Sequence, residues 1–161
     1  MCPLPTLINL KRKYKAYLYV DEAHSMGALG QNGRGIVEHF GCNQRDIDIL
    51  MGTFTKSFAS AGGYIGGPHA LINYLKHTSH AHCYASSMSP VICTKIMSIL
   101  DEFMLLSIND SQMLDLRLRL NMLKENTVYF RARLKSLGFC VLGDDASPVV
   151  LCLIRVPGKN M

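Results

Sequence analysis

An acid, a histidine and a lysine follow two short apolar stretches of this sequence. Asp21 and His24 come after residues 16–20, and Lys56 comes after residues 49–54. A carboxylate at the end of a buried strand needs a cationic or hydrogen-bonding partner, and a protonated ring nitrogen is one such partner. An amine set among phenylalanines and small residues is partly desolvated and suited to act as a nucleophile. We therefore expect a cofactor site in which Lys56 is the reactive group.

Each of these residues also has a plain structural explanation. Asp21 could cap the turn that follows it, and Lys56 could be a surface lysine whose stem lies on apolar neighbours. His24 alone would be an ordinary loop histidine. The three together favour function, because His24 comes three residues after Asp21 and can face the same side when the chain turns. It would then hydrogen-bond a second polar atom of the same ligand.

Hydroxyl groups and glycines near Lys56 could hold a phosphate. Thr53 offers a hydroxyl, and the glycines of residues 62–67 offer exposed backbone N–H groups. Ser86 and Ser87 could add further phosphate ligands. Ser89 is explained as the N-cap of a helix that begins with a proline.

The composition argues against several other classes of site. The net charge is +5 with scattered Lys and Arg, which is typical of solvated helix faces rather than a nucleic-acid patch. No apolar stretch reaches the roughly 20 residues of a membrane helix. The six cysteines form no CxxC pair, so we expect reduced and mostly buried thiols. His77, His80, His82 and Cys83 share no common face at their spacing, and we expect no metal site.

Alternating strands and helices must position the candidate residues. Strands are expected at 16–20, 49–54, 64–65, 139–142 and 149–156, and helices from Pro68, from Pro90 and over 112–136. Residues 1–15 read as a basic lead-in and residues 78–89 as a polar connection. The alternation predicts an α/β fold with a mainly parallel sheet flanked by helices. Such sheets bind ligands at the carboxyl ends of their strands, where Asp21 and Lys56 fall.

Four segments of the chain together resemble a known family. They are YLYVDEAHSMGALGQNGRGIVEHFG, DILMGTFTKSF, GGYIGG and YASSMSP. They are similar to the α-oxoamine synthases, which are fold-type I pyridoxal-phosphate enzymes related to class II aminotransferases, and most of all to the serine palmitoyltransferase branch with its catalytic long-chain-base subunits. The resemblance implies that residues 1–110 are the second half of the large cofactor-binding domain. Residues 111–161 would be a connecting helix and the start of a smaller C-terminal α+β domain.

The resemblance also implies a role for each candidate residue. Lys56 matches the lysine that forms a Schiff base with pyridoxal 5′-phosphate and later serves as a base. Asp21 matches the acid that pairs with the pyridinium nitrogen, and His24 the histidine near the phenolic oxygen. Thr53 matches a phosphate-binding hydroxyl.

The implied reaction is a decarboxylating condensation of L-serine with a fatty acyl-CoA, palmitoyl-CoA, to 3-ketosphinganine. It is the first step of sphingolipid biosynthesis, at the cytosolic face of the endoplasmic reticulum membrane. The implied partner is a homologous subunit, in a dimer that we expect to be a heterodimer. Ser86 and Ser87 would lie near the phosphate bound by that partner.

The sequence departs from the family pattern directly after the reactive lysine. The family usually has Gly-Ala-Ser after KSF, whereas this chain has Ala59, Ser60 and Ala61. If residue 59 has a positive φ, alanine there costs about 1 kcal/mol or more. The family's cofactor-stacking aromatic residue and its substrate-carboxylate arginine have no counterpart in these 161 residues. We therefore expect a fragment that carries the catalytic signature.

Two alternatives remain open from the sequence. A truncated chain could bind the partner subunit through the dimer surface and do no chemistry. The segment from Val20 to His24 is also the motif of DEAH-type NTPases, whose acidic pair serves Mg²⁺ and water. That alternative predicts an upstream GxxxxGK[ST] motif, which this chain lacks.

Overall fold

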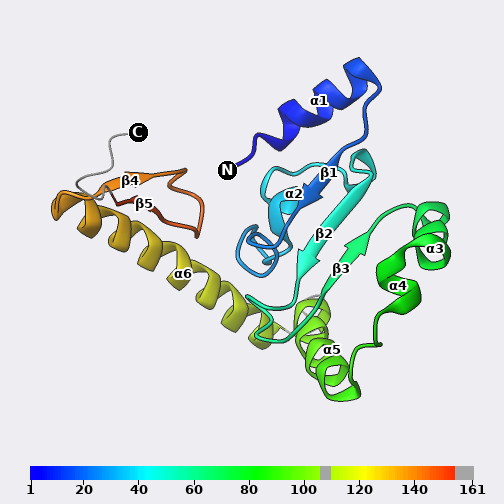
Figure 1. Ribbon diagram of the computed structural model, residues 1–161. Coiled ribbons are helices and arrows are strands. Elements are labelled where there is room, and N and C mark those ends of the chain that lie inside the picture. The colour runs from blue at the N-terminus through cyan, green and yellow to red at the C-terminus, as the bar shows by residue number, and fades with distance from the viewer. Residues whose placement is uncertain (106–109, 155–161) are drawn as a thin grey trace.

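The computed structural model describes residues 1–105 and 110–154 of the chain. Its elements in chain order are α1 (Leu4–Tyr14), β1 (Tyr19–Asp21), α2 (Gly35–His39), the 3₁₀ turn η1 (Gln44–Asp46), β2 (Ile49–Thr53), β3 (Gly63–Gly66), α3 (His69–Thr78), α4 (His80–Tyr84), α5 (Pro90–Leu105), α6 (Asp110–Ser136), β4 (Cys140–Leu142) and β5 (Leu151–Leu153). The sheet β1–β2–β3 lies at the centre of Figure 1, with α3 and α4 on one side and α6 leading away to the β4–β5 hairpin. The α/β fold class and the strands expected near the candidate residues are confirmed.

The central sheet is mixed. β1 and β2 are parallel, with Tyr19 opposite Ile49 and Asp21 opposite Met51. β3 runs antiparallel to β2, because a parallel return needs a crossover of a dozen or more residues and residues 54–62 are too few. The parallel pair therefore consists of the two strands that lead to the candidate residues, and β3 forms a hairpin with β2.

The first apolar cluster lies where α1 and α2 meet the sheet. It consists of Leu4, Ile8, Val20, Ile36, Val37 and Ile47. The basic lead-in at residues 1–15 contains the helix α1, in which Leu4 and Ile8 are one helical turn apart and both are buried. Ion pairs hold the far end of α1, because Lys11 Nζ lies 2.7 Å from Asp48 Oδ2 and the Arg12 guanidinium 2.6 Å from Asp46 Oδ1.

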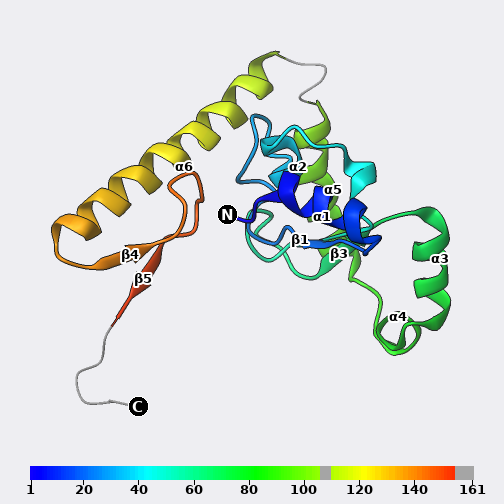
Figure 2. The same ribbon diagram turned by 90° about the horizontal axis from the view of Figure 1, so that it is seen from above.

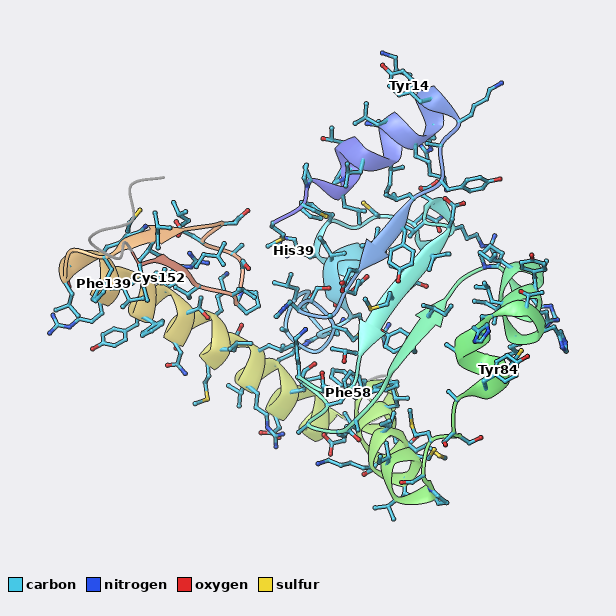
Figure 3. The ribbon with its side chains drawn as sticks, in the orientation of Figure 1. Tyr14, His39, Phe58, Tyr84, Phe139 and Cys152 are labelled. Carbon is cyan, nitrogen blue, oxygen red and sulfur yellow. The ribbon has the colours of Figure 1, made fainter. Side chains whose placement is uncertain are left out.

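The second apolar cluster lies between α5 and the segment after β2. Phe54, Phe58 and Ile96 are its buried members, and Ile92, Ile99 and Phe103 pack against them. Figure 3 shows Phe58 directed toward α5. The ring centroid of Phe58 lies 5.2 Å from that of Phe54 and 5.7 Å from that of Phe103. The helical spacing of apolar residues predicts that Ile92, Ile96, Ile99, Leu100 and Phe103 form the buried face of α5, and all of them except the exposed Leu100 belong to this cluster or pack against it.

Two short helices follow β3 and stand apart from the sheet. Residues 80–84, within the expected polar connection, form α4, and the Ser79 hydroxyl accepts a hydrogen bond from His82 N at 3.3 Å as its N-cap. Neither α3 nor α4 has a buried residue. Figure 2 shows both helices projecting away from the sheet, with α6 on the opposite side.

The described cysteines are more exposed than the sequence suggested. Cys2, Cys83, Cys140 and Cys152 are exposed, and Cys42 and Cys93 are half-buried. The expectation of mostly buried thiols is therefore wrong. All six are free thiols in the structure, as expected from their spacing.

The long helix α6 ends at Ser136, and Gly138, two residues further on, has φ +85°, as is common for a glycine that follows the end of a helix. The spacing of apolar residues in this helix predicts an apolar face that includes Leu123 and Val128, but both are exposed. The strands β4 and β5 pair antiparallel and confirm the two C-terminal strands. Residues 155 and 156 of the second expected strand lie outside the described residues.

A buried arginine joins α6 to the β4–β5 hairpin. The Arg131 side chain is 2% exposed. Its guanidinium donates hydrogen bonds to Leu142 O at 3.0 Å, Ser147 O at 3.3 Å and Val149 O at 2.6 Å. Hydrogen bonds from a charged donor are stronger than neutral ones. Arg131 therefore fixes the hairpin and the turn between its strands against the helix.

We predict that Arg131→Met weakens the hairpin, because three carbonyl oxygens lose their charged donor at a cost of about 2 kcal/mol. Amide hydrogen exchange in β4 and β5 should accelerate roughly tenfold or more. Arg133→Met, which replaces an exposed arginine of the same helix, is the control and should change little. Equal exchange rates in the two variants would contradict the role given to Arg131.

Candidate active site

Asp21 is the last residue of β1 and lies at the carboxyl end of the parallel pair. Its side chain is exposed, and Oδ1 accepts a hydrogen bond from Ala23 N at 2.8 Å. One oxygen thus caps the following turn, as the structural explanation of Asp21 requires. The ladder continues one residue past Asp21, since Glu22 N donates to Met51 O at 2.6 Å. Asp21 is therefore held on an ordered backbone with its carboxylate facing solvent.

His24 and Lys56 line the same cleft. The cleft has a volume of about 610 Å³, and its walls include Ala59 in the segment after β2, Phe103 on α5 and Leu120 on α6. Both polar side chains are exposed. The structure therefore brings together two of the three residues that the sequence selected, and it places Asp21 at the end of the strand that leads to His24.

The turn that carries Lys56 separates polar from apolar groups. Phe54 and Phe58 point into the second apolar cluster, while Lys56 is exposed. The expectation that these phenylalanines desolvate Lys56 is therefore wrong. Ala59 N donates to Lys56 O at 2.8 Å and closes the turn. Buried rings on one side thus fix the orientation in which the amine faces the cleft.

A hydroxyl ties this turn to the loop that carries His24. Ser57 Oγ donates a hydrogen bond to Met26 O at 2.6 Å. A Cβ at Gly27 would lie only 2.6 Å from Ser57 Cβ, so a larger residue there would push the two loops apart. The Ser57 hydrogen bond therefore sets the spacing between the Lys56 turn and the His24 loop.

The predicted phosphate ligands Thr53, Ser86 and Ser87 are not among the residues that line this cleft. The Thr53 hydroxyl donates to Gly62 O at 3.1 Å and lies 2.8 Å from Thr55 Oγ. Ser86 and Ser87 are exposed, between α4 and α5. Their expected role concerns a phosphate on another subunit, so it stays a prediction.

Sequence reasoning missed Glu22, which is 2% exposed. Its Oε2 accepts hydrogen bonds from Ser25 Oγ at 2.9 Å and from Ile36 N at 3.2 Å. Burial raises the pKa of the Glu22 carboxyl above its ordinary value. Gly35 has φ +86°, and a Cβ there would overlap Glu22 Oε2, so glycine is required. The only sequence signal was an acid beside Asp21 at the end of an apolar run.

These residues fit pyridoxal phosphate in their donor chemistry. The cleft offers an amine at Lys56 and an imidazole at His24, and an exposed carboxylate lies at Asp21. Its volume lies within the range of about 300–1,000 Å³ that is usual for small-molecule sites. Among residues 1–105 and 110–154, no three His, Cys, Asp or Glu side chains lie close enough to hold a metal ion. Within the same ranges, no helix is both long and apolar enough to cross a membrane.

Comparison with known proteins places nearly the whole chain in one group. A family model described as aminotransferase class I and II matches residues 2–157. Serine palmitoyltransferase 3 is 49% identical over 156 residues in Mus musculus and 50% in Homo sapiens. Long chain base biosynthesis protein 2b of Arabidopsis thaliana is 46% identical over 159 residues. These alignments cover 97–99% of the chain but only 27–32% of each relative.

Solved structures of serine palmitoyltransferases are also similar to this chain. A serine palmitoyltransferase from S. paucimobilis with a bound PLP–myriocin aldimine has a TM-score of 0.81 and 25% identity, covering 98% of this chain and 38% of that one. A serine palmitoyltransferase structure with a PLP internal aldimine has a TM-score of 0.78 and 26% identity, covering 98% of this chain and 37% of that one. The fold around the candidate site is therefore that of these proteins.

The buried Glu22 predicts a pH dependence of stability. Because its folded-state pKa is raised above the ordinary 4.5, the protonated form is favoured in the folded chain. This contribution to stability is complete below about pH 4.5 and is lost as pH rises through the raised folded-state pKa. We predict that the unfolding free energy of Glu22→Gln decreases less with rising pH than that of the wild type. Urea unfolding at a series of pH values measures this.

Glu125→Gln is the control for the loss of one acidic group, since Glu125 is exposed on α6. The difference in unfolding free energy between wild type and Glu22→Gln should change with pH, and that between wild type and Glu125→Gln should change less. A Glu22→Gln difference that is constant from pH 4 to pH 8 would contradict the assignment.

Proposed function

The chain belongs to the aminotransferase class I and II family, and from this membership we propose that it carries the cofactor-binding core of a pyridoxal-phosphate-dependent serine palmitoyltransferase. The resemblance seen in the sequence motifs is confirmed. The observation that carries the proposal is the convergence of Lys56 and His24 on one cleft, with Asp21 at the end of the adjoining strand. Activity, substrates and partners remain part of the proposal, because the chain spans about 27–32% of the length of its relatives.

Four side chains would hold the cofactor. Lys56 would bind it covalently, Asp21 would keep a proton at the ring nitrogen, His24 would orient the ring through its phenolic oxygen, and Thr53 would contact the phosphate. When bound, pyridoxal phosphate supplies an electron sink that stabilises a carbanion. Asp21 is suited to its role because it is exposed and fixed by its own bond to Ala23 N.

Lys56 has a second task once an amino acid is bound. Its freed amine would accept the α-proton of L-serine, and the resulting carbanion would attack the thioester carbon of a fatty acyl-CoA such as palmitoyl-CoA, with CoA leaving as its thiol. Loss of CO₂ and return of a proton to the same carbon then give 3-ketosphinganine. The relatives named serine palmitoyltransferase support these substrates. The turn through Ala59 favours this use of Lys56, because it keeps the amine at the cleft surface rather than in the apolar cluster.

The division of the chain and its cellular site are further parts of the proposal. Residues 1–110 would form the second half of the large domain, and residues 111–161 a connecting helix and the start of the small domain. The cytosolic face of the endoplasmic reticulum membrane is proposed from the named relatives alone.

A second candidate function is binding to a homologous subunit without chemistry. It is favoured by α3 and α4, which have no buried residue and present Tyr74 and Tyr84 at 64% and 79% exposure. Exposed aromatic side chains on one surface are typical of protein interfaces. Ser86 and Ser87, which follow α4 directly, would then reach the partner's phosphate. The family match leaves the DEAH-type NTPase alternative without support.

We predict that Lys56→Ala abolishes covalent attachment of pyridoxal phosphate. The chain is incubated with the cofactor, reduced with borohydride and mapped by peptide mass spectrometry. Lys76→Ala, which removes an exposed lysine of α3, is the control and should leave the labelled peptide unchanged. Labelling spread over surface lysines, with no excess at Lys56, would contradict the proposal.

We predict that Tyr84→Asp weakens association with a homologous subunit at least fivefold, because it places a charge in an apolar contact. Co-expression with the tagged human relative and quantitative co-purification measure this. Tyr17→Asp, which alters an exposed tyrosine at the other side of the sheet, is the control. Equal losses from both variants would show that α4 is not the contact.

A further inference from the structure

The turn that presents Lys56 contains a residue in an unfavourable backbone conformation. Ala59 has φ +43°, in the left-handed region that glycine adopts freely and other L-residues avoid. Within residues 1–105 and 110–154, the only other non-glycine residue with positive φ is Lys15. Lys15 is the C-cap of α1, where this conformation is common. Ala59 has no helix end to explain it.

Contacts on both sides hold Ala59 in this conformation. Its N–H donates to Lys56 O at 2.8 Å, and the next residue, Ser60, donates through N to Phe54 O at 2.8 Å. The preceding residue, Phe58, is 1% exposed and cannot leave the second apolar cluster without losing its packing. The turn between these fixed points passes through residue 59 in the left-handed region. Strain of this kind persists only where the surroundings determine the conformation.

We propose that Ala59 is a positioning residue whose strained backbone limits the presentation of Lys56, so that glycine at this position strengthens both the turn and the capture of an aldehyde by Lys56. The aldehyde part rests on the function proposed above. Ala59 lines the same cleft as Lys56 and His24. A shift of the turn to relieve Ala59 would therefore move the amine relative to the cleft.

The expected size of the effect follows from the left-handed conformation. The equilibrium constant for adopting the left-handed conformation is roughly fivefold or more smaller for an L-residue than for glycine. In the capture reaction the Lys56 nitrogen forms a C=N bond with the aldehyde carbon, and the carbonyl oxygen leaves as water. A turn that populates the presenting conformation more fully raises the apparent affinity by the ratio of the two populated fractions, which is at most the same factor.

The test compares Ala59→Gly with Ala61→Gly. Both remove one methyl group from the same exposed segment, and Ala61 is not among the residues with positive φ. Pyridoxal phosphate is titrated into each folded protein, the product is reduced with borohydride, and labelling of Lys56 is quantified against the exposed Lys76 and Lys135 as internal references. Ala59→Gly should lower the half-saturating concentration for Lys56 labelling by up to roughly fivefold, with no change at the reference lysines.

Ala61→Gly should leave Lys56 labelling unchanged or weaker, because glycine adds freedom to the unfolded chain. An equal gain in both variants, or no gain from Ala59→Gly, would overturn the positioning role. Urea unfolding is the second measurement. Ala59→Gly should raise the urea concentration at the unfolding midpoint, and Ala61→Gly should not. If no variant is labelled at Lys56, the proposed function fails while the urea arm still decides whether Ala59 is strained.

Discussion

The parallel pairing of β1 with β2 is the constraint on which the rest of the site depends. It places the carboxyl ends of both strands at one edge, so Asp21 leaves the sheet beside the segment that leads to Lys56. The Glu22 N–H extends the ladder to Met51 O, and the Ser57 hydroxyl links the two following loops through Met26 O. The chemistry-bearing side chains are thus set by backbone hydrogen bonds more than by contacts among themselves.

The apolar clusters determine which side of the sheet edge the reactive groups face. Burial of Phe54 and Phe58 against α5 directs Lys56 outward into the cleft. Glu22 turns inward and closes the loop before α2, while its neighbour Asp21 stays exposed. Desolvation of Lys56 would therefore come from a bound cofactor rather than from the hydrophobic core of this chain. The same arrangement places the strained backbone of Ala59 three residues after Lys56, in the turn that presents the amine.

The sequence predicted the parts of the structure that depend on local pattern. Runs of β-branched and aromatic residues located the strands, and proline and glycine located the ends of α5 and α6. The helix α1 was missed because its burial depends on Leu4 and Ile8 and on distant ion pairs such as Lys11 with Asp48. The inward position of Glu22 arises from long-range approach to Ile36, and no spacing rule reveals it.

The central claim is that Asp21 and Lys56 act on one ligand at the edge of the β1–β2 pair. The most direct measurement is the ¹⁵N chemical shift of the ring nitrogen of labelled pyridoxal phosphate added to the chain. The account predicts a protonated ring nitrogen in the bound form of the wild type and an unprotonated one in Asp21→Asn. A bound cofactor whose ring nitrogen has the same shift in both proteins would contradict the account.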